Sequence, residues 1–96
     1  MAYIVGDLVR LKVTWTDINS GLHDPEALTC RVKDPAGEVS VYTLESGDIV
    51  HDLDGVYHCD VPTGVLSGMW HYRWESTGRY AGAEEGQFYV DPSTVI

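Results

Sequence analysis

The strongest indication of the fold is the stretch Met69-Trp70-His71-Tyr72-Arg73-Trp74-Glu75. Successive side chains of an extended chain point to opposite faces, so the three aromatic rings, at every second position, share one face. Met69 and the polar side chains take the other face. This alternation predicts a central strand whose rings fill a core.

Alternation with a period of two recurs along the chain, as in Val9, Leu11 and Val13. Turn formers separate the periodic segments, and Asp54-Gly55 is the strongest hairpin signal. The expected strands are residues 9–16, 28–33, 39–44, 49–53, 56–61, 69–75 and 87–90. About seven short strands predict an all-β, antiparallel, two-sheet sandwich, with an open barrel as the alternative.

Length and charge restrict the domain organisation and the partners. The 96 residues suit one β-sandwich domain over 1–96, with 94–96 as a short tail. A net charge of −9 argues against nucleic acid and anionic membranes as partners, and favours a neutral or basic protein surface. The basic residues are spread along the sequence, which predicts no basic patch. No secretion signal or membrane span is recognisable, so we expect synthesis in the cytoplasm.

The chain has two cysteines, Cys30 and Cys59, which could form a disulfide or remain free thiols. Paired cysteines suit a disulfide, but without a secretion signal two cysteines more often remain buried thiols. His58 beside Cys59 does not indicate a catalytic pair, because neighbouring strand residues point to opposite faces. No nucleophile elbow or phosphate-binding loop is present, so the sequence predicts no catalytic, cofactor-binding or metal-binding residue and no enzyme activity.

Several polar and aromatic groups have a second interpretation. The histidines and aspartates offer ligands for zinc, and three aspartates offer ligands for calcium, but neither set matches a known ligand spacing and a solvated sheet face is favoured. The three tryptophans suit a sugar-binding face, although a small core also needs them. These residues are His51, Asp52, His58, Asp60 and His71 for zinc, Asp48, Asp52 and Asp54 for calcium, and Trp15, Trp70 and Trp74 for sugar.

The loops at the ends of the sandwich are the expected contact regions, because recognition usually lies in loops. These loops are residues 17–25, 64–68 and 81–86, and the candidate interface residues in or beside them are Asp24, Glu26, Glu84 and Glu85.

Taken together, several of these segments resemble two known protein families. Asp54-Gly55-Val56-Tyr57-His58-Cys59 resembles part of an immunoglobulin domain and suggests a tyrosine corner at Tyr57, but the tryptophan between the two cysteines is missing. A wider pattern is similar to small immunoglobulin-like structural proteins of tailed bacteriophages, including the amino-terminal domains of baseplate upper proteins. It consists of Gly6-Asp7, Gly55-x-Tyr57, Pro62, Gly68-x-Trp70-x-Tyr72-x-Trp74-x-x-x-Gly78, Glu85-Gly86-x-Phe88-x-Val90 and Pro92-Ser93.

The phage resemblance implies an immunoglobulin-like sandwich that acts by assembly, as a head decoration, neck or connector, or tail accessory protein. It implies no cofactor, and as partners other virion structural proteins, copies of the same chain, or both. The protein would be assembled in the host cytoplasm and reside in the virion. A carbohydrate- or receptor-binding module and a small metal-dependent enzyme are the alternatives.

Overall fold

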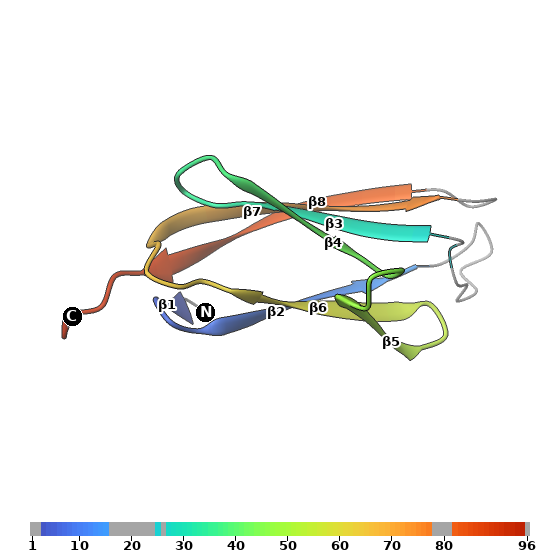
Figure 1. Ribbon diagram of the computed structural model, residues 1–96, viewed down its shortest axis with the longest axis horizontal. Helices are drawn as coiled ribbons and strands as arrows, with labels where there is room; N and C mark the ends of the chain where they lie inside the picture. The colour runs from blue at the N-terminus through green and yellow to red at the C-terminus, as the bar shows by residue number, and fades with distance from the viewer. Residues whose placement is uncertain (1–2, 16–24, 26, 78–81, 96) are drawn as a thin grey trace.

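A computed structural model of the chain describes residues 3–15, 25, 27–77 and 82–95. These residues form strands and turns and contain no helix, so none of them provides a helix able to cross a membrane. Two sheets face each other as a sandwich (Figure 1). The strands are β1 (Tyr3–Ile4), β2 (Leu8–Thr14), β3 (Ala27–Lys33), β4 (Val39–Thr43), β5 (Ile49–Leu53), β6 (Val56–Pro62), β7 (Gly68–Thr77) and β8 (Gly82–Asp91). The predicted all-β sandwich is confirmed, with eight strands.

The strand order is β1-β8-β7-β3-β4 in one sheet and β2-β6-β5 in the other. All pairings are antiparallel except that of β1 with β8. This arrangement corresponds to A-G-F-C-C′ and B-E-D in immunoglobulin nomenclature. The motif around Tyr57 therefore lies on the E-like strand, whereas the tyrosine corner of immunoglobulin domains lies on strand F.

The core lies between the two sheets. Each long strand contributes every second residue, as the sequence alternation predicts. The three tryptophans are buried, which confirms that they fill the core. The core residues are Val9, Leu11, Val13, Trp15, Leu28, Cys30, Val32, Ile49, Tyr57, Cys59, Val61, Trp70, Trp74, Phe88 and Val90.

The hairpin predicted at Asp54-Gly55 forms between β5 and β6, and a second hairpin joins β3 and β4. In the β3–β4 turn, Asp34 Oδ1 accepts hydrogen bonds from the backbone N–H groups of Ala36 and Glu38, each at 2.9 Å. Between β5 and β6, Gly55 adopts φ +74°, a left-handed conformation that glycine tolerates best. Local turn chemistry thus fixes two of the strand connections.

The last strand is longer than predicted. β8 spans Gly82–Asp91, whereas the sequence suggested a short strand over 87–90 preceded by a loop over 81–86. The ten-residue β7 pairs with β8 along its length, from Gly68 opposite Val90 to Ser76 opposite Gly82. Tertiary pairing therefore overrides the low strand propensity of the glycines and glutamates in this segment.

Candidate functional site

Four basic side chains lie together on the outer face of the five-stranded sheet. Arg31 and Lys33 point outward from β3, between its buried positions, and His71 and Arg73 point outward from β7. Pairing sets Arg31 directly opposite Arg73 and Lys33 directly opposite His71. We refer to these four residues as the cationic face. Strand pairing thus brings together basic residues that are far apart in the sequence.

Two carboxylates offset part of this charge. Like charges directly opposite each other destabilise a sheet, so the two arginines need counter-charges. Glu75 forms an ion pair with Arg31, and Glu85 Oε2 accepts a hydrogen bond from Arg73 Nη1 at 2.8 Å. Arg73 Nε also lies 3.7 Å from Glu75 Oε1. All four side chains are at least 38% exposed, so these pairs add little net stability.

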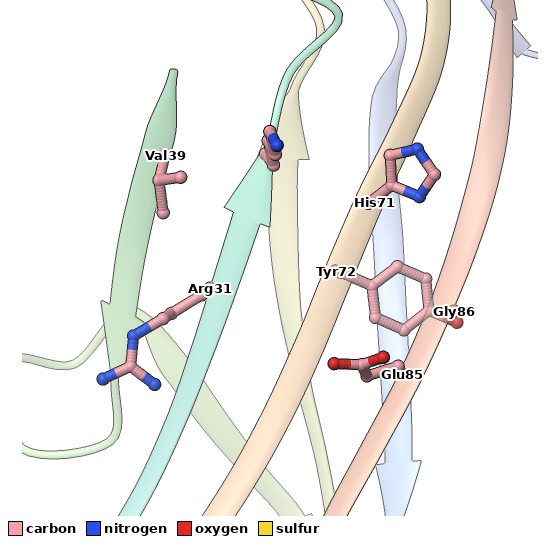
Figure 2. Close-up of a pocket in the computed structure, with 7 residues that line it drawn as sticks. Arg31, Val39, His71, Tyr72, Glu85 and Gly86 are labelled. Carbon is pink, nitrogen blue, oxygen red and sulfur yellow. The ribbon is translucent and has the colours of Figure 1, made fainter. Parts of the chain in front are cut away.

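Lys33 and His71 differ from the arginines. In the part of the chain that the structure describes, no side-chain hydrogen bond or ion pair joins either residue to another. A shallow hollow of about 220 Å³ lies beside them, and Figure 2 shows its walls. It is lined by Arg31, Lys33, Val39, His71, Tyr72, Glu85 and Gly86.

The edge of the hollow is apolar. Val39 and Val41 on β4 are 51% and 52% exposed, and they lie directly opposite Lys33 and Arg31. Ammonium and guanidinium groups beside exposed aliphatic side chains can bind a carboxylate and cover an apolar contact at once. This combination suits an acidic protein surface.

Tyr72 packs closely against the backbone of β8. An added Cβ at Gly86, directly opposite Tyr72, would lie 2.3 Å from the Tyr72 hydroxyl oxygen. Burial, followed by the carboxylate of Glu84, raises the pKa of Tyr72 above its ordinary value. A side chain at position 86 would displace this ring, so glycine shapes one side of the hollow.

The four predicted interface residues differ in where they lie. Asp24 and Glu26 lie outside the described residues. Glu84 and Glu85 are exposed but lie within β8 and not in a loop. They point to opposite faces, and Glu85 already pairs with Arg73 at the hollow. Only Glu85 of the described pair therefore belongs to the candidate site.

The histidines and aspartates do not gather into a metal site. His58 Nδ1 lies 2.7 and 2.8 Å from the two carboxylate oxygens of Asp52, and the residue is only 7% exposed, contrary to the expected solvated position. The His51 ring stacks on Tyr57 instead, with centroids 4.5 Å apart. His71 lies on the other sheet. Among the described residues, no group of three or more His, Cys, Asp or Glu side chains is placed to hold a metal ion.

The tryptophans do not form an exposed sugar-binding platform. Trp15, Trp70 and Trp74 are 8%, 6% and 0% exposed, respectively. Trp70 stacks on Phe88 inside the sandwich, with centroids 5.7 Å apart. Their aromatic surface serves the core, so a sugar-binding role would need other residues.

The cationic face does not follow from the sequence pattern alone. One signal was present, since Arg31 and Lys33 alternate with core residues in one segment while His71 and Arg73 do so in another. The alternation assigned all four to outer faces. It did not show that β3 and β7 are neighbours, and that pairing creates the site.

Comparisons with known proteins give a structural neighbour and no family. No family model matches the chain, and no curated protein matches it. The structure is similar to part of chitinase ChiW from Paenibacillus sp. str. FPU-7, described as a bacterial cell-surface-expressed multi-modular enzyme machinery. The TM-score is 0.66 at 18% sequence identity, over 92% of this chain and 8% of that one. At this identity the likeness supports the sandwich fold alone.

Proposed function

We propose that this protein is a non-enzymatic structural component of a tailed-phage particle, which docks through its cationic face onto an acidic surface of a neighbouring virion protein. The observation that carries the docking proposal is the pair Lys33 and His71, opposite each other beside the hollow and without partners among the described residues. Charged groups that are not engaged within a domain are available to a partner.

The charge distribution gives this docking an orientation. Arg31, Lys33 and Arg73 face Glu75 and Glu85 on the same surface, a balance of three cations against two carboxylates. Because the chain as a whole carries −9, the rest of the molecule carries −10. The net charge of −9 favours a neutral or basic partner over most of the surface, but the outer face of this sheet is locally positive and suits an acidic group.

A protein partner suits this surface better than a nucleic acid. One net positive charge is small beside the several uncompensated Lys and Arg contacts that phosphate backbones need. Exposed apolar residues adjoin the cations: Val39 and Val41 on β4, and Met69 opposite Tyr89 on β7 and β8. Mixed apolar and charged groups are typical of protein interfaces.

The assignment to a phage particle draws on the sequence resemblance. The matching glycine and aromatic pattern is concentrated in β7 and β8, the hairpin that carries half of the cationic face. The resemblance implies repeated docking on a capsid, neck or tail. The partner is then another virion structural protein or a second copy of this chain.

Mass spectrometry of density-gradient-purified particles tests the proposal. We expect a fixed copy number relative to the major shell protein, and its value separates a shell decoration from a neck or tail ring. Absence from intact particles would contradict the structural role.

Two matched variants test the docking face. Lys33→Glu reverses the charge beside the hollow, whereas Lys12→Glu makes the same reversal at an outward position of β2 on the other sheet. We expect Lys33→Glu to reduce incorporation at least about tenfold, since interfacial charge reversal costs about 1.4 kcal/mol or more. Lys12→Glu should incorporate normally. Equal incorporation of both folded variants would exclude the cationic face.

A further inference from the structure

The fold brings the two cysteines of the chain together. Cys30 points inward from β3 in the five-stranded sheet, and Cys59 points inward from β6 in the three-stranded sheet. Both are 0% exposed. Both are free thiols in the single core cluster between the facing sheets. Each cysteine is the main cause of the other's pKa shift, upward for Cys30 and downward for Cys59, as expected for two thiols that approach each other across the core.

The surroundings of the pair are consistent with this contact. Tyr42 lies directly opposite Cys30 on β4. Its pKa is raised, chiefly by burial and then by the sulfur atoms of Cys59 and Cys30. Both cysteines thus lie near the same phenol. The hydrogen bond to Cys59, together with burial, raises the pKa of the Cys30 thiol well above its ordinary value.

We propose that Cys30 and Cys59 are a site of covalent modification, an inter-sheet disulfide that forms on exchange with a small disulfide oxidant such as oxidised glutathione. The bridge joins the C-like and E-like strands. The inter-sheet disulfide of antibody domains joins strands B and F, so this linkage connects the same two layers at another place.

The chemistry is two successive thiol–disulfide exchanges. The thiolate of one cysteine attacks a glutathione sulfur, forms a mixed disulfide and releases one glutathione thiolate. The second cysteine, as thiolate, attacks the protein sulfur of the mixed disulfide and releases the second glutathione thiolate. The two protons lost by the cysteines end on the released glutathiones, and the two electrons reduce the oxidant.

Burial determines when this reaction occurs. A thiol with no exposed surface reacts slowly, so the exchange requires a transient opening of the sandwich or takes place during folding. The same burial then shields the finished bridge from reductants. The disulfide therefore forms slowly in the folded protein and persists once formed.

The test is oxidation of the purified protein by oxidised glutathione, during refolding from urea and separately in the folded state. Intact mass should fall by two hydrogens, and the free thiols measured in denaturant should disappear. The unfolding equilibrium constant should fall on the order of 100-fold, because the cross-link restricts the unfolded chain. Refolding with the oxidant should give faster bridging than incubation of the folded protein.

Cys59→Ala and Cys30→Ala are the matched controls, since each leaves one thiol and no route to an internal bridge. Each should show no hydrogen loss and no oxidant-dependent gain in stability. A wild-type protein that keeps both thiols free, ends as a glutathione adduct, or becomes less stable when bridged would overturn the proposal. These outcomes do not depend on docking or on particles, so they leave the proposed function untouched.

Discussion

The outer faces of the two sheets use their charges differently. On the three-stranded sheet, Arg10 holds Asp60 with two hydrogen bonds, at 2.9 and 3.1 Å, and Asp52 holds His58. On the five-stranded sheet, Lys33 and His71 lie opposite each other without partners among the described residues. The first face holds Arg10, Asp60 and His58 in internal pairs, whereas the second presents a hollow beside Lys33 and His71.

This difference arises from register and not from composition. Both faces consist of the outward residues of alternating strands. On the three-stranded sheet the register sets Arg10 opposite Asp60, and Lys12 lies opposite His58, whose ring is held by Asp52. On the five-stranded sheet the register sets Arg31 opposite Arg73. A surface with residual charge of one sign is available to a partner, and for this reason we place docking there.

The largest expected effect is a difference in the free energy of unfolding between substitutions on the inner and on the outer face of the five-stranded sheet. Trp74 is fully buried, and its replacement by alanine should lower the free energy of unfolding by about 3 to 5 kcal/mol. Arg73→Ala, one residue away on the outer face, should change it by about 0.5 kcal/mol or less. Urea denaturation measures both. If Trp74→Ala does not fold, Trp74→Phe provides a smaller truncation for the same comparison.

A smaller effect is expected at Gly86, next to the hollow. Gly86→Ala places a methyl group against Tyr72, so we expect a loss of about 1 to 3 kcal/mol in the free energy of unfolding. In a Tyr72→Ala background the same change should cost much less, because the obstructing ring is gone. A double-mutant cycle by urea denaturation measures this coupling, and strictly additive effects would refute the close packing.

On the three-stranded sheet, Asp52→Ala tests whether the internal pairs matter. It removes the carboxylate that holds the buried His58 ring and should cost about 1 kcal/mol of unfolding free energy. Asp54→Ala, at the exposed turn beside it, is the control and should be nearly neutral. Equal losses of unfolding free energy in the two variants would show that the hydrogen bond to His58 does not stabilise the fold.

The smallest effect is a pH dependence at Asp60. The hydrogen bond from Arg10 is the main reason that the pKa of this carboxyl is below its ordinary value. The resulting stability is fully present above the unfolded pKa of about 3.9 and is lost as pH falls through the lower folded pKa. We expect Asp60→Asn to remove this component of acid destabilisation. Unfolding free energies from pH 6 to 2 should show a shallower decline in the variant.

Much of the fold follows from local sequence. Alternating side chains identified the buried rings of β7, and Asp54-Gly55 identified a hairpin, because both signals involve neighbouring residues. The length of β8 could not be predicted from local sequence. Its glycine- and glutamate-rich first half becomes a strand only because β7 offers partners along its whole length.

The candidate site was harder to predict than the fold. The sequence directed attention to acidic loop residues such as Glu84 and Glu85, whereas the structure places both in a strand. His58 was expected on a solvated face, and neighbouring strands bury it. Contacts between strands depend on pairing order and register, which local patterns do not specify.

The sequence by itself determined which side chains face inward, since the geometry of an extended chain fixes alternation within each strand. That was sufficient for an all-β sandwich with buried tryptophans. The tertiary structure alone decided that Lys33 meets His71 on one surface and that Cys30 meets Cys59 across the core. The two residues of each pair are distant in the chain. They come together because whole strands pack and pair so as to minimise exposed apolar surface and unpaired backbone groups.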